Sequence, residues 1–236
     1  MPNGARRADL PRPAAGPPRI GAAPGELEIV QRFVNTLDIE AGTDELDSPA
    51  ALTAWLERHG LFAGRGRSAS PGPAAEQAPR AAAHVAVTAT DLRRAVALRE
   101  ALRAVLRSHV SAAAGGVTPG AVAGGGGAGR ELPVIAATLR TRLEVSDDGR
   151  VAVAPAGSGA SAVLARILLI VAEAGNNGTW SRLKVCSAAD CQWAFYDRSP
   201  TRTGCWCSMR VCGSRSKSRA YRGRASARTG ASQGDG

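Results

Sequence analysis

The chain has 236 residues, of which 28 are glycine and 14 are proline, and its formal net charge is +10. This length allows one sizeable core plus a small module. The first twenty residues lack the apolar stretch of a signal peptide, and the most apolar run, residues 162–172, is too short to span a membrane. We therefore expect a cytoplasmic protein.

The positive charge is concentrated at the C-terminal end. Residues 181–236 hold eleven Lys or Arg against three Asp, which gives +8, whereas residues 1–180 hold nineteen basic and seventeen acidic groups, which gives +2. A nearly neutral body with a basic end is typical of a protein that meets a polyanion.

The N-terminal part of the chain predicts an α+β domain over residues 25–176, mostly helical with one β-hairpin. Residues 1–24 are rich in Pro, Ala and Gly, which favours disorder. Apolar residues at helical spacing predict a helix over residues 26–37. Ser48 as N-cap, followed by Pro49, favours the start of a second helix that Gly60 ends.

The middle of the chain predicts a long helix, a hairpin and an apolar helix. Thr90 is the expected cap of a helix over residues 91–112, followed by a loop over residues 113–129. Alternating residues in 139–145 and 151–153 predict a hairpin with one face on the core. Residues 161–174 predict a central helix that Gly175 ends. The expected solvated basic face of the long helix holds Arg93, Arg94, Arg99 and Arg103.

The sequence shows no catalytic constellation, and we expect no enzyme activity. The three histidines, His59, His84 and His109, lie far from one another and from the cysteines. The close carboxylates Asp38, Glu40 and Asp44 are expected in a solvated turn. No Gly-rich segment stands between a strand and a helix with a lysine, as a phosphate-binding loop requires.

All five cysteines lie between residues 186 and 212, and two pairs share one spacing, Cys186-x4-Cys191 and Cys207-x4-Cys212. Two such pairs are what a closed, tetrahedral structural zinc site needs. We expect one Zn²⁺ at these four thiolates. Cys205 is then a spare thiol or a substitute ligand. Gly213 is expected to let the backbone turn so that amide groups point at the sulfur.

The same segment resembles the CGNR zinc finger of bacterial transcription regulators. The resemblance rests on Leu183-Lys-Val-Cys186, Trp193-x-Phe195-Tyr196-Asp197-Arg198, Trp206-Cys207-Ser208-Met209 and Val211-Cys212-Gly213-Ser214-Arg215. One departure is that Ser214 stands where the family has Asn. Two N-terminal runs, residues 33–38 and 44–56, are similar to the ABATE domain that precedes this finger. The resemblance implies a treble-clef-like or ribbon-like finger over residues 180–222, a disordered tail over 223–236, and a DNA-binding transcription regulator.

The basic side chains of the finger are the candidate contacts to duplex DNA. Residues 208–222 lack proline and are expected to be helical, which would align arginines on one face. We expect the N-terminal domain to sense a small effector or to form a homodimer. The alternative functions are those of a protein-interaction adaptor and of an RNA-binding module. The candidate nucleic-acid contacts are Arg198, Arg202, Arg210, Arg215, Lys217, Arg219 and Arg222.

Overall fold

The computed structural model describes residues 21–61, 86–113 and 128–231, and within these ranges it describes the side chains of all residues but 111–113, 128–130 and 223–231. The helices are α1 (Leu27–Val34), α2 (Pro49–Arg58), α3 (Ala89–Ala113), α4 (Ala128–Thr138), α5 (Gly159–Asn176) and α6 (Ser214–Ala231). The strands form three antiparallel pairs: β1 (Leu37–Asp38) with β2 (Thr43–Asp44), β3 (Thr141–Val145) with β4 (Val151–Pro155), and β5 (Leu183–Val185) with β6 (Ala194–Tyr196). The α+β class is confirmed.

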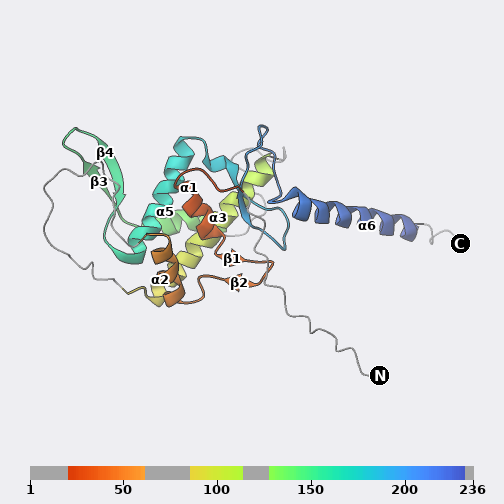
Figure 1. Ribbon diagram of the computed structural model, residues 1–236, viewed down its shortest axis with the longest axis horizontal. Coiled ribbons are helices and arrows are strands. Elements are labelled where there is room, and N and C mark those ends of the chain that lie inside the picture. The colour runs from red at the N-terminus through yellow and green to blue at the C-terminus, as the bar shows by residue number, and fades with distance from the viewer. Residues whose placement is uncertain (1–20, 62–85, 114–127, 232–236) are drawn as a thin grey trace, which may run out of the picture.

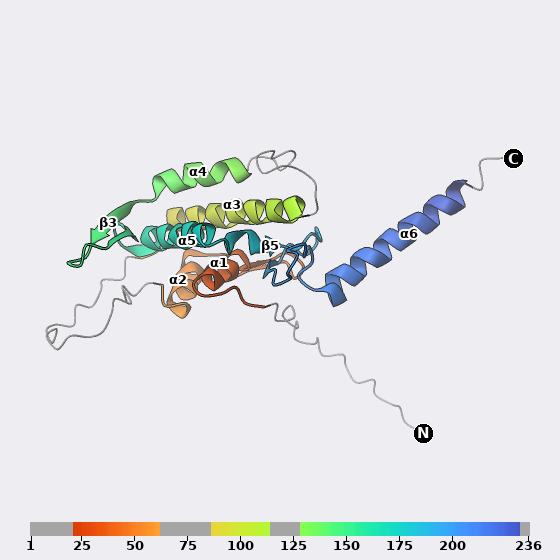
Figure 2. The ribbon, with the colours of Figure 1, turned by 90° about the horizontal axis from the view of Figure 1, so that it is seen from above.

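The helices α1, α3 and α5 form the centre of the molecule (Figure 1). Seen from above, α4 lies along α3 on the side away from α1 and α2 (Figure 2). The β3–β4 hairpin and α6 project from opposite ends of this body in both views. The two features that reach furthest from the core are therefore far from each other.

One apolar cluster joins the N-terminal helices to the hairpin β5–β6. It contains fully buried side chains of α1, α2, α3 and α5, such as Phe33, Trp55, Leu98 and Ile167. The same cluster includes buried side chains of the β5–β6 hairpin, namely Leu183, Val185 and Ala194. The hairpin of the cysteine-rich segment is therefore part of the main core. Burial of its apolar side chains there stabilises both the hairpin and the helices.

The ends of α2 follow the prediction, whereas the start of α3 lies earlier. Ser48 Oγ accepts the Ala51 N–H, and Gly60 has a left-handed φ of 64°. The cap of α3 is Thr88 rather than Thr90: Asp91 N–H donates to Thr88 Oγ1, and Thr88 N–H donates to Asp91 Oδ2. This reciprocal pair satisfies two backbone donors, which a lone Thr90 cap would not do.

The expected solvated basic face of α3 is wrong for two of its four arginines. Arg93 and Arg94 are exposed, but Arg99 and Arg103 are each only 2% exposed. Arg99 donates to both carboxylate oxygens of Asp44, at 2.6 and 2.9 Å, so Asp44 is not part of a merely solvated turn either. A buried guanidinium is tolerated because its N–H groups find charged or carbonyl acceptors.

The β3–β4 hairpin does not place a face on the core, which corrects the prediction from its alternation. Every residue of β3 is exposed, and Leu143 and Val145 are 70% and 69% exposed. Their cross-strand partners, Val153 and Val151, are more than half exposed as well. Alternation shows which residues share a face, but it does not show what covers that face.

Three helices differ from the sequence prediction. No helix is predicted for α4, where Pro133 lies inside the helix and masks its pattern. Helix α5 continues past Gly175, and the residue that adopts the left-handed φ after it is Gly178. Helix α6 runs to Ala231, beyond the expected end of the finger at residue 222.

Among the described helices, α5 has the length and apolar composition that crossing a membrane would require. A core helix meets the same criterion, and α5 buries Val163, Leu164, Ile167 and Ile170 in the main cluster. Arg166 on its exposed side pairs with Glu26. These contacts are those of a core helix.

The burial of Arg99 can be tested against an exposed arginine of the same helix. We expect Arg99→Met to lower the free energy of unfolding by about 2–3 kcal/mol, because Asp44 loses its charged partner. Arg93→Met should change it by less than about 0.5 kcal/mol. Urea unfolding followed by circular dichroism measures both; equal effects would contradict the buried ion pair.

Candidate metal centre and nucleic-acid interface

The first cysteine pair lies in the tight loop that joins β5 to β6. Cys186 follows β5, and its N–H donates to the Trp193 carbonyl oxygen at 2.9 Å. The N–H groups of Cys191 and Gln192 both donate to the Ala188 carbonyl oxygen at 3.0 Å. Gln192 has a positive φ of 50°, which turns the chain into β6. These bonds bring the two thiols onto the same side of the loop.

The second pair lies where α6 begins. Cys207 precedes a π-helical turn, Met209–Gly213, which contains Cys212 and runs directly into α6. Gly213 does not direct its amide at a sulfur, as expected from the sequence, because its N–H donates to the Ser208 carbonyl oxygen. A Cβ at Gly213 would lie 2.9 Å from Met209 Sδ, so a larger residue there would displace the exposed end of the Met209 side chain.

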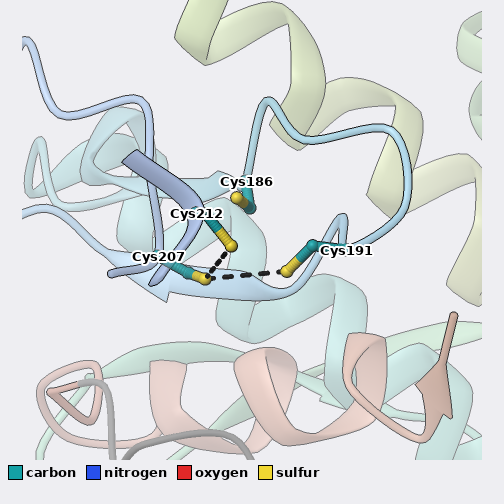
Figure 3. A group of neighbouring side chains, drawn as sticks. All are labelled: Cys186, Cys191, Cys207 and Cys212. Carbon is teal, nitrogen blue, oxygen red and sulfur yellow. Dashed lines mark hydrogen bonds between the residues drawn. The ribbon is translucent and has the colours of Figure 1, made fainter. Parts of the chain in front are cut away.

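The four sulfur atoms of Cys186, Cys191, Cys207 and Cys212 point toward one another and lie within 4.8 Å of each other (Figure 3). Cys191 Sγ and Cys212 Sγ each lie 3.6 Å from Cys207 Sγ. Tetrahedral zinc–sulfur bonds of about 2.3 Å place the sulfurs about 3.8 Å apart. The group therefore fits one zinc ion with four thiolate ligands, which leaves no open coordination position and makes the site structural.

The neighbouring thiols favour the ionised form of Cys186. Hydrogen bonds from the Cys191 and Cys207 thiols lower the pKa of the Cys186 thiol. A thiolate is the form that zinc binds, and a bound Zn²⁺ deprotonates its remaining thiol ligands. Cys205 stands outside the group of four; its carbonyl oxygen accepts the Ser187 N–H and so fixes the backbone beside Cys186.

A buried ion pair supports the finger and was not predicted from the sequence. Lys184 and Asp197 are 1% and 4% exposed, and Lys184 Nζ lies 2.8 Å from Asp197 Oδ2. Burial alone would raise the pKa of Asp197, but hydrogen bonds from Lys184 and Ser199 hold it well below its usual range. The carboxylate also accepts the Gly204 N–H, which ties the loop before Cys207 to the hairpin. A lysine between two apolar strand residues is the sequence signal for such a pair.

The predicted helical arginines gather around one concavity at the start of α6. Its volume is ≈ 570 Å³. Two of its arginines are ion-paired: Arg215 with Glu40 at 2.5 Å and Arg219 with Asp190 at 3.2 Å. Glu40 lies between β1 and β2, so this contact joins α6 to the N-terminal region. The arginines that line the concavity are Arg210, Arg215, Arg219 and Arg222.

The remaining basic candidates lie elsewhere on the finger. Arg198 donates to the Ala22 carbonyl oxygen and lies over the Tyr196 ring, and Arg202 is exposed in the loop after β6. Lys217 is on α6 but does not line the concavity. Tyr221 on α6 is exposed, whereas Tyr196 is half-buried against the main cluster.

His59 and His109 have structural contacts. The third histidine, His84, lies outside the described residues. The ring of His59 lies against Trp55 at an interplanar angle of 52°, and His109 Nδ1–H donates to the Leu183 carbonyl oxygen at 2.8 Å. Burial lowers the pKa of His109, which favours the neutral ring. Neither histidine lies among the zinc ligands.

Comparison with known protein families agrees with this geometry. Residues 182–225 match the family described as "CGNR zinc finger". Residues 27–174, more than half of the chain, match the ABATE family, described as "Putative stress-induced transcription regulator". The chain belongs to the ABATE family. No curated protein matches it. The ABATE region covers α1 to α5, and the finger covers the zinc centre and the start of α6.

The choice of ligands can be tested by metal analysis of single cysteine variants. We expect the purified chain to hold one zinc per molecule, and Cys205→Ser to retain it. Cys191→Ser should release zinc far more readily, because three thiolates leave one coordination position to water. Elemental analysis paired with thiol titration measures this. Loss of zinc from Cys205→Ser alone would contradict the assignment.

Proposed function

We propose that this ABATE protein is a cytoplasmic, zinc-dependent transcription regulator that binds duplex DNA through the start of α6. The observation that carries the proposal is the concavity lined by four arginines, one just before the zinc ligand Cys212 and three after it. Because the ion fixes the turn that begins α6, it also fixes where these guanidinium groups lie. No catalytic activity is proposed.

The chemistry of this surface matches a phosphate backbone. Guanidinium groups bind phosphate oxygens with paired hydrogen bonds, and phosphate contacts supply most of the non-specific affinity for DNA. Arg215, Arg219 and Arg222 recur at i, i+4 and i+7, which places them on one side of the helix. A helix carrying such a row fits against the backbone or within a groove.

Two carboxylates already occupy part of this surface. Glu40 and Asp190 hold Arg215 and Arg219, and all four side chains are about half exposed. Exposed pairs of this kind contribute little stability, so a phosphate can displace the carboxylates at small cost. The pairs orient the arginines before DNA arrives, and they lower the affinity slightly.

The affinity for DNA should fall steeply with salt and depend on the arginines of α6. We expect Arg215→Ala to weaken binding to a short duplex and to reduce the slope of log affinity against log salt by about 1. Arg32→Ala, which removes an exposed arginine paired to Glu28 in α1, is the matched control and should change neither. Fluorescence anisotropy over a salt series measures both quantities.

Glu40→Gln provides a test of opposite sign, because it frees Arg215 and should raise the affinity about two- to fivefold. If the zinc-loaded chain fails to bind duplex DNA at low salt, or binds RNA or an acidic protein in preference, the proposed function is wrong.

The proposal includes a homodimer formed through the β3–β4 hairpin. Leu143, Val145, Val151 and Val153 expose one apolar face, and an isolated two-stranded hairpin needs such a face covered to be stable. Four charges of the hairpin are paired within it, Arg142 with Glu144 and Arg150 with Asp148. Asp147 in the turn leaves a net charge of −1, which is too small to select a strongly basic partner. A second copy of the same face is the occupant that this pattern favours.

Self-association should therefore depend on one face of the hairpin. We expect the chain to form dimers as its concentration rises, and Leu143→Lys to abolish them by placing a charge in the apolar contact. Ala152→Lys, on the opposite face of the same hairpin, is the matched control and should leave the dimer intact. Sedimentation velocity measures the assembly. A chain that stays monomeric throughout would overturn the proposed dimer.

A small effector of the ABATE region is the least constrained part of the proposal. A concavity of ≈ 400 Å³ lies between α3 and the first zinc loop, lined in part by Arg107, Val110, Cys186 and Gln192. A molecule bound there would contact both the regulator region and the finger. This position is the one we propose for an effector.

A further inference from the structure

Side chains of α1 and α3 hold two of the three residues that follow the zinc ligand Cys191, namely Gln192 and Ala194. The contacts reach residues 192–194 from Gln31 and Asn35 of the α1 end and from Arg103 of α3. All three side chains belong to the ABATE region, and the residues they hold belong to the finger. We call this set of contacts the 192–194 clamp.

Asn35 makes the most specific contact of the 192–194 clamp. Its Oδ1 accepts the Ala194 N–H at 2.7 Å, and its Nδ2 donates to the Ala194 carbonyl oxygen at 2.9 Å. Ala194 of β6 is the register partner of Val185 of β5. The N–H and the carbonyl group of Ala194 point away from β5, toward the outer edge of β6. The carboxamide of Asn35 thus takes the place of a third strand and satisfies both buried backbone groups.

Gln31 and Arg103 complete the clamp on either side of Asn35. Gln31 Nε2 also donates to the Ala194 carbonyl oxygen, at 3.3 Å. Arg103 donates to the Gln192 carbonyl oxygen at 3.0 Å and to the Val34 carbonyl oxygen at 2.7 Å, so one buried guanidinium bridges α1 and the finger. Gln31 and Arg103 are buried, which makes these bonds costly to break.

The clamped residues are also bonded to the zinc site on their other side. Trp193, between Gln192 and Ala194, accepts the N–H of the ligand Cys186, and Cys191 directly precedes the segment. The segment 192–194 therefore connects α1 and α3 to two of the four ligands, Cys186 and Cys191. If the clamp is absent, the loop that presents Cys186 and Cys191 loses its outer support.

We propose that Asn35 is a positioning residue for the zinc centre, and that zinc affinity is coupled to the ABATE region through the 192–194 clamp. The finger is then not an independent module: the ABATE region slows zinc release, and bound zinc orders α1. Such a coupling is reciprocal, so each side stabilises the other by the same factor. The inference depends on the zinc site and not on the proposed binding of DNA.

The rate of zinc release tests this coupling. We expect Asn35→Leu, in the full zinc-loaded chain, to release zinc to a chromophoric chelator roughly tenfold faster, because Ala194 loses both partners. The control is Leu52→Ala, which removes a fully buried side chain of α2, outside the 192–194 clamp, and should destabilise the fold while speeding release much less. Equal release rates for Asn35→Leu and the unsubstituted chain, or equal acceleration by Leu52→Ala, would overturn the proposal.

Hydrogen exchange of the unsubstituted chain gives a second test that does not require the variant to fold. Removal of zinc with a chelator should raise amide exchange in α1, at the end that carries Asn35, about tenfold, while α2 changes much less. Exchange in α1 that is the same with and without zinc would show that the clamp does not transmit the metal's effect, whatever the chain does with DNA.

Discussion

The structure depends on the meeting of four thiol groups from two loops. The two loops pack against each other only in a small cluster of buried residues around the thiols. A zinc ion bound by all four supplies about 10–16 kcal/mol in comparable small fingers, which is enough to fix both loops and the turn that starts α6. The arrangement of hairpin, loop and helix around the ion is treble-clef-like, because the first loop and the helix start each supply two ligands.

The finger differs from an isolated zinc module in what lies beneath it. Its hairpin shares the main apolar cluster with α1, α3 and α5, and its outer strand edge is satisfied by side chains of the N-terminal region. The buried pair of Lys184 and Asp197 adds a third tie, inside the finger itself. A buried pair of this kind is weak evidence for stability, but it fixes one arrangement of the loops because few others satisfy both charges.

Much of the site could be predicted from the sequence because its signals are local. Cysteine spacing alone identified the four ligands, and Ser48 with Pro49 located the start of α2. The parts that were missed depend on distant contacts. Periodicity placed Arg99 and Arg103 off the apolar stripe of α3, but only the folded chain shows Asp44 and the carbonyl oxygens that make their burial acceptable. The prediction for the β3–β4 hairpin failed for the converse reason. Its residues do alternate, but no described element covers its apolar face.

The π-helical turn at Met209–Gly213 has a consequence for the direction in which α6 presents its side chains. Gly213 N–H bonds to the carbonyl oxygen five residues earlier, at Ser208, so the turn holds one residue more than an α-helical turn would. One residue corresponds to about 100° of rotation around a helix axis. The extra residue therefore sets the angular phase of the whole arginine row relative to the metal. Deleting it would swing that row about a quarter of the way around the cylinder, with the ion still in place.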